Sequence, residues 1–135
     1  MPRVNVELRN ISGTNAAAGW AGSHTVVVDR PEGKAGGMGL GFNGGQLLAL
    51  SLGGCFCNDL RYAAEQLGIE LADIAVSVFL ELDGEPLVAT HAEMQVRCTA
   101  ADGSDAAPVI ARAKSICTVA NTLRRGMDVT VSNAG

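Results

Sequence analysis

The segment from Gly41 to Ile69 constrains the fold most, because it predicts one long helix with unusually little polar surface. Its first half, from Leu47 to Cys57, is almost free of polar side chains, with Ser51 the exception. The apolar residues do not keep to one face, and a helix that is apolar all round is buried on all sides. We therefore expect a central core helix of about 22 residues, roughly 33 Å long.

The second half of this helix is amphipathic, so one face meets the core and the other meets water. Gly68 follows at the position of a C-cap glycine. The apolar part is shorter than the roughly 20 residues that cross a bilayer, so we expect no membrane span. The apolar positions are Leu60, Ala63, Ala64 and Leu67, and the polar ones are Asp59, Arg61, Glu65 and Gln66.

The rest of the chain predicts strands and one further helix in the order β-β-α-β-β-α-β, a single α+β domain spanning residues 1–135. The second helix is expected to begin near Ser104 as N-cap, with Pro108 in its first turn, and to end at Gly126. The intervening segments 10–23 and 31–45 are predicted as loops, and the second lacks the pattern of a phosphate loop. Alternating or apolar runs predict strands over residues 4–9, 24–29, 74–82, 87–98 and 127–131.

The assembly and the location of the protein follow from the same features. One small sheet and one second helix hardly cover a helix on all sides, so we expect a homodimer that shares its core.

A net charge of −4 without a basic stripe argues against nucleic-acid binding. The start Met1-Pro2-Arg3 leads directly into a strand-like segment, so we expect no signal peptide and a cytoplasmic location.

Four cysteines carry the chemistry that the sequence offers, and in the cytoplasm they are expected to be reduced. A buried cysteine is usually a small inert hydrophobe, which is the simpler interpretation of Cys57 and Cys98. Cys55 and Cys117 each lie on a helix face that must be buried. If the two helices pack together, these two thiols come within disulfide range, although inert packing stays open for them as well.

A metal site is a third interpretation of the cysteines, and the spacing disfavours it. Cys55 and Cys57 point to different sides of the helix, whereas metal-binding pairs are usually spaced C-x2-C. A second Cys or His pair is missing, because His24 and His91 stand alone in predicted strands. We therefore predict neither a metal nor a cofactor.

Three segments resemble the OsmC/Ohr family, the osmotically inducible and organic hydroperoxide resistance proteins. They are GGQLLALSLGGCF (44–56), LGIELADIAVSV (67–78) and AKSICTVANTL (113–123), and the resemblance runs from about His24 to Val131. It implies an OsmC-like α+β fold in which two chains intertwine into a homodimer with long central helices.

The resemblance also implies thiol peroxidase chemistry, with Cys55 and Cys117 at the positions of the family's two catalytic cysteines. The first cysteine attacks the O–O bond of an organic hydroperoxide and becomes a sulfenic acid. The second condenses with it to a disulfide, which an external dithiol reduces. The reaction needs a thiolate at the first cysteine and a nearby thiol that prevents over-oxidation.

The chain departs from the family at the Arg–Glu pair that activates the first cysteine in the best-characterised hydroperoxidases. The family carboxylate lies at the start of the long helix, where this chain has Gly45-Gln46, and residues 12–20 contain no arginine. Arg30, Lys34 and Arg125 are the alternative sources of a cation. The alternative function is accordingly a non-enzymatic OsmC-like dimer that binds a hydrophobic small molecule or serves stress physiology by another route.

Overall fold

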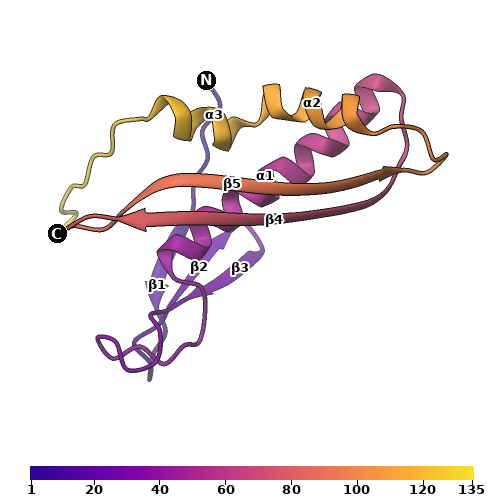
Figure 1. Cartoon of the computed structure of the whole chain (residues 1–135). Helices are drawn as coiled ribbons and strands as arrows, with labels where there is room; N and C mark the ends of the chain where they lie inside the picture. The colour runs from indigo at the N-terminus through magenta and orange to yellow at the C-terminus, as the bar shows by residue number, and fades with distance from the viewer. The chain divides into compact units, whose positions relative to one another are not determined.

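The computed structural model describes residues 1–135 and divides into two compact units, Met1–Leu48 and Ala49–Gly135. The secondary structure is mixed, which confirms the α+β class (Figure 1). None of the helices is both long and apolar enough to cross a bilayer. The elements are β1 (Glu7–Asn10), β2 (Ala17–Ala21), β3 (His24–Val28), α1 (Gly44–Leu67), β4 (Leu71–Asp83), β5 (Val88–Ala100), α2 (Ala107–Ile116) and α3 (Thr118–Arg125).

The first unit contains an antiparallel sheet in the order β1-β2-β3. The prediction of a loop over residues 10–23 is wrong for β2, whose sequence AAGWA lacks β-branched residues and is recognisable as a strand only by its pairing. Strand β1 begins at Glu7 rather than at residue 4, because Glu7 pairs with Trp20 and β2 ends one residue later.

The glycine-rich segment after β3 is a loop, as predicted, and Asp29 organises it. The Asp29 carboxylate accepts backbone N–H bonds from Arg30, Met38 and Leu40 at 2.7, 3.1 and 3.0 Å. The bond from Leu40 is the largest of the effects that lower the pKa of Asp29. A Cβ at Gly37 would lie 2.6 Å from the carbonyl oxygen of Arg30, so the close return of the chain requires glycine there.

Helix α1 spans 24 residues, close to the predicted length, and both of its ends have a local cause. At its start, Gln46 N–H donates to Asn43 Oδ1 at 2.9 Å, and Asn43 N–H donates to Gln46 Oε1 at 3.0 Å. This reciprocal pair is a capping box, which satisfies two free N–H groups of the first turn. At its end, Gly68 adopts φ 68°, which confirms the predicted C-cap glycine.

The second unit is built on a long antiparallel hairpin of β4 and β5, drawn as the two longest arrows in Figure 1. The apolar side chains of one hairpin face pack against the helices, while the other face is exposed. Helix α1 approaches closely, since a Cβ at Gly53 would lie 2.8 Å from Val78 Cγ2. The inward residues packed against the core are Ile74, Val76, Val78, Ala92, Met94, Val96 and Cys98.

The C-terminal part of the second unit departs from the prediction in three details. One helix was expected between Ser104 and Gly126, but Cys117 adopts an extended conformation (φ −65°, ψ 106°) that divides it into α2 and α3. Ala106 rather than Ser104 precedes the first helical residue, without a side-chain cap. The predicted strand over residues 127–131 is absent because the segment has no partner strand, and its apolar side chains are exposed.

The prediction that the central helix is buried on all sides is wrong for the single chain. The face formed by Leu52, Phe56 and Leu60 is buried, but Leu50 is 48% exposed and Gly54 also faces solvent. The physical reason is that one hairpin and one pair of short helices cover only one side of a helix. The opposite side, which includes the apolar Leu50, remains open.

Candidate functional site

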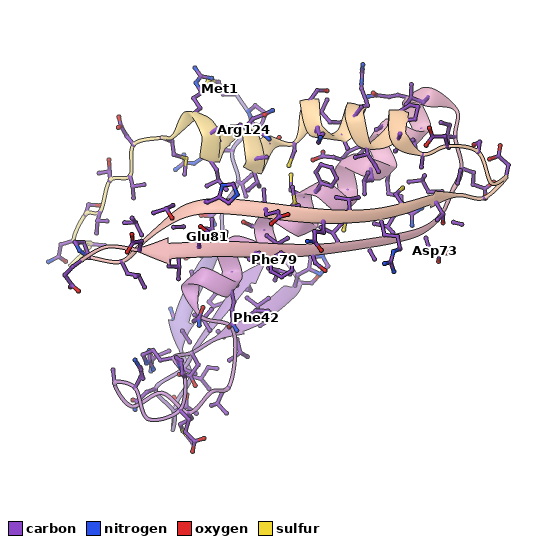
Figure 2. The ribbon with its side chains drawn as sticks, viewed as in Figure 1. Met1, Phe42, Asp73, Phe79, Glu81 and Arg124 are labelled. Carbon is purple, nitrogen blue, oxygen red and sulfur yellow. The ribbon has the colours of Figure 1, made fainter.

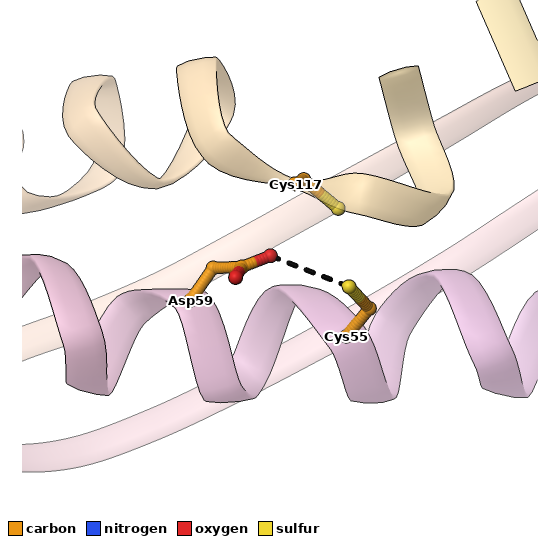
Figure 3. Close-up of side chains that lie close together, drawn as sticks. All are labelled: Cys55, Asp59 and Cys117. Atoms are coloured by element: carbon orange, nitrogen blue, oxygen red, sulfur yellow. Dashed lines mark hydrogen bonds between the residues drawn. The ribbon is translucent and has the colours of Figure 1, made fainter. Parts of the chain in front are cut away.

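Cys55, Asp59 and Cys117 meet where α1 passes the junction of α2 and α3, and together they form what we call the thiol–carboxylate cluster (Figure 3). Each residue contributes one atom, a thiol sulfur or a carboxylate oxygen, and all three atoms lie within 4.8 Å of one another. Cys55 and Asp59 are four residues apart on α1, so they project from the same helix face one turn apart.

Cys117 reaches this position because the second helix is interrupted at that residue. Its extended conformation ends α2 and makes it the N-cap residue of α3, whose Asn121 N–H donates to the Cys117 carbonyl at 2.9 Å. The Cys117 side chain is completely buried, in the same core cluster as Leu60 and Val109. The break therefore fixes the thiol against α1.

The electrostatic character of the cluster is set by Asp59, which is only 6% exposed. Cys55 Sγ donates a hydrogen bond to Asp59 Oδ2 at 3.4 Å. No lysine or arginine forms an ion pair with Asp59, and Arg30, one of the predicted cation sources, pairs with Asp29 instead. A carboxylate and two thiols thus share a buried site without a cation.

Burial raises the pKa of the Cys117 thiol to about 11. This value already includes the neighbouring Cys55 and Asp59 side chains, which also raise the pKa, and the backbone N–H of Ala120 in the first turn of α3, which lowers it. Cys117 is therefore held as a neutral thiol at physiological pH. A neutral thiol is a poor nucleophile.

This raised pKa predicts a loss of stability at alkaline pH. Between about pH 9 and about pH 11 an unfolded Cys117 ionises while the folded one stays protonated, so the unfolded chain binds fewer protons and unfolding becomes easier. About 1 kcal/mol of unfolding free energy should be lost by about pH 10. Urea unfolding at about pH 8 and about pH 10 measures it. The Cys117→Ser variant is the control and should lack this loss, and an equal loss in both proteins would contradict the assignment.

The other two cysteines stand apart from the cluster. Cys57 is half-buried on α1, and Cys98 is half-buried on the inward face of β5, as its predicted alternation required. Burial raises the pKa of Cys98, and the charge of Arg61 lowers it. The structure thus brings together the two cysteines singled out by sequence and leaves the other two outside.

The amphipathic pattern predicted Asp59 on the solvent-facing side of the helix, and this prediction is wrong because Asp59 is buried. Its spacing of four residues from Cys55 was the available signal, because residues at that spacing share a face. An open depression lined by Asp59, Tyr62, Glu65, Gln66 and Ile116 lies beside it. Asp59 therefore belongs both to the thiol–carboxylate cluster and to the lining of this depression.

Comparison with known proteins places these features in a family. A sequence model described as OsmC-like protein matches residues 36–132. No curated protein shows significant sequence similarity to the chain.

Solved structures share the fold. An OsmC-like protein from Mycoplasma pneumoniae is 14% identical with a TM-score of 0.75, covering 91% of this chain and 88% of its own. An organic hydroperoxide resistance protein OsmC from Legionella pneumophila is 20% identical with a TM-score of 0.64, covering 92% and 90%. The organic hydroperoxide resistance protein OhrB of Bacillus subtilis is 22% identical with a TM-score of 0.58, covering 89% and 90%. The matched residues include all three members of the thiol–carboxylate cluster, and the chain belongs to the OsmC-like protein family.

Proposed function

We propose that the protein is a cysteine-based peroxidase that reduces organic hydroperoxides, with Cys55 as the peroxidatic and Cys117 as the resolving thiol. The observation that carries this proposal is the approach of the two sulfur atoms to within 4.8 Å, from helices about sixty residues apart in sequence. Family membership and the likeness to organic hydroperoxide resistance proteins support the same chemistry.

The two roles follow from the difference in exposure. Cys55 is only partly buried and is the more accessible residue of the two, whereas Cys117 is completely buried and held as a neutral thiol. A resolving thiol needs no early ionisation, since it reacts only after a sulfenic acid has formed beside it. Cys117 belongs to a hydrophobic core cluster with Phe56 and Val109, and Cys55 packs against it, which suits a hydrophobic hydroperoxide better than a polar one.

The proposed reaction has three steps. The Cys55 thiolate attacks the O–O bond, the alcohol leaves after taking a proton, and Cys55 becomes a sulfenic acid. The Cys117 thiol then displaces the sulfenic hydroxyl as water, which forms the Cys55–Cys117 disulfide. An external dithiol supplies two electrons and two protons and restores both thiols.

The alternative function, a non-enzymatic OsmC-like dimer in stress physiology or small-molecule binding, is favoured by one observation. Asp59 accepts a hydrogen bond from Cys55, so the charged group beside this thiol is a buried carboxylate and not a cation. The family's activating arginine has no counterpart paired with this carboxylate.

Peptide mapping separates the two functions. The protein is treated with cumene hydroperoxide and digested without reductant, and linked peptides are identified by mass spectrometry. We expect a Cys55–Cys117 link and no link through Cys57 or Cys98. Free thiols persisting at both Cys55 and Cys117 under excess hydroperoxide would leave only the non-enzymatic function.

We also propose that the protein is a cytoplasmic homodimer whose two chains share a core. Leu50 on α1 and Phe79 on β4 are 48% and 52% exposed in the single chain, and Figure 2 shows Phe79 on the hairpin. Interfaces of shared-core dimers bury on the order of 2,000–5,000 Å². Light scattering at micromolar concentration should give twice the mass of the 13.8 kDa chain, and a folded monomer would contradict the proposal.

A further inference from the structure

We propose that the reduced thiol–carboxylate cluster is also a binding site for a thiophilic divalent cation of the Zn²⁺ class, with Cys55 Sγ, Asp59 carboxylate and Cys117 Sγ as the three protein ligands. This inference goes beyond the peroxidase function. Cation binding needs no catalytic turnover, so it can be tested separately from that function.

The geometry of the cluster fits the coordination sphere of Zn²⁺. Typical Zn–S and Zn–O bonds of about 2.3 and 2.1 Å place tetrahedral ligand atoms roughly 3.6–3.8 Å apart. The observed Cys55 Sγ–Asp59 Oδ2 distance is 3.4 Å, and no pair in the cluster exceeds 4.8 Å. Adjustments on the order of 1 Å, within the reach of side-chain rotation, close the site around an ion.

The charge of the cluster gives the physical reason for binding. Asp59 is almost fully buried without an ion-pair partner, and a buried carboxylate is costly unless a cation accompanies it. A divalent ion supplies that cation and displaces one proton from each thiol, so two thiolates and one carboxylate surround two positive charges. Sulfur donors select thiophilic ions such as Zn²⁺ over Mg²⁺ or Ca²⁺, which prefer oxygen.

The secondary structure holds the three proposed ligands in place. Cys55 and Asp59 are held one turn apart on α1, and Cys117 is fixed by the junction of α2 and α3 within the buried core. Three protein ligands leave a fourth tetrahedral position for water or another small ligand. Asp59, one of the three ligands, also lines the open depression with Tyr62 and Glu65.

Metal binding and peroxide reduction use the same two sulfur atoms, so one function affects the other. If the proposed peroxidase function holds, one hydroperoxide and two protons convert the metal-bound dithiolate into the disulfide, an alcohol, water and the released ion. The oxidised protein then has lost two of its three ligands. The bound ion would thus mark the reduced state of the protein.

Titration of the reduced full-length chain with Co²⁺, a spectroscopic substitute for Zn²⁺, tests the proposal. We expect one Co²⁺ per chain, tetrahedral d–d bands, a thiolate-to-cobalt charge-transfer band, and displacement of Co²⁺ by Zn²⁺. Asp59→Asn keeps the shape of the side chain and should weaken binding at least about tenfold. The controls Asp73→Asn, at an exposed carboxylate on β4 (Figure 2), and Cys57→Ser should bind as the parent does.

A second variant keeps the proposal testable if Asp59→Asn fails to fold, as judged by circular dichroism. Cys117→Ser removes one thiolate, so the charge-transfer band should fall by about half or disappear with the loss of binding. Unchanged affinity in folded Asp59→Asn, an undiminished band in Cys117→Ser, or no thiolate band in the parent protein would each overturn the proposal. None of these results depends on whether hydroperoxide is consumed, and peptide mapping of the disulfide tests that function separately.

Discussion

Cys55→Ser is expected to abolish consumption of organic hydroperoxide, whereas Cys117→Ser should complete a single turnover and stop. Without the Cys55 sulfur no nucleophile reaches the O–O bond, because Cys117 is completely buried and held as a thiol by a pKa of about 11. In Cys117→Ser the first attack is unchanged, but the sulfenic acid at Cys55 has no thiol within reach and remains open to over-oxidation.

Hydroperoxide consumption with a dithiol reductant is measured for Cys55→Ser, and the single turnover of Cys117→Ser is measured without reductant, by mass spectrometry after trapping with dimedone. Cys117→Ser should show a dimedone adduct at Cys55 and, at higher peroxide, a sulfinic acid at the same residue. Cys57→Ser and Cys98→Ser are the matched controls, because both residues lie outside the cluster, and they should keep full activity. Full multiple-turnover activity in Cys55→Ser would rule out the proposed mechanism.

Leu60→Ala should destabilise the protein by about 2–5 kcal/mol, the usual cost of a cavity in a well-packed core. Leu60 is completely buried and belongs to the core cluster that contains Val109, Ala113 and Cys117. A small domain has only about 5–15 kcal/mol of stability in total, so this single change is expected to leave a marginal fold. The loosened packing should also reduce disulfide formation between Cys55 and Cys117.

Leu67→Ala is the matched control, since it removes the same atoms from the same helix at a residue that is 45% exposed. Its cost should stay below about 1 kcal/mol, because little apolar area leaves the interior. Denaturant unfolding at one fixed protein concentration gives both values and limits the contribution of dimer dissociation. Similar losses in the two variants would mean that α1 does not pack against α2 and α3 as described.

The sequence by itself determined the elements whose signals are local. The apolar run and the C-cap glycine Gly68 defined α1, and alternation over 74–82 and 87–98 defined the hairpin that became β4 and β5. Each of these signals comes from a few neighbouring residues and the periodicity of one element, which the chain carries irrespective of its tertiary contacts. The family resemblance added the expectation that Cys55 and Cys117 react as a pair.

Only the tertiary structure decided features that depend on partners distant in sequence. Strand β2 has a weak β-propensity and exists through its pairing with β1 and β3, while residues 127–131 have the strand pattern but no partner. The division of the last helix at Cys117 places a buried thiol against α1, which helical periodicity alone does not reveal. Asp59 is the clearest case, because a carboxylate is usually a surface residue, and only the tertiary structure shows that this one is buried beside two thiols from separate elements.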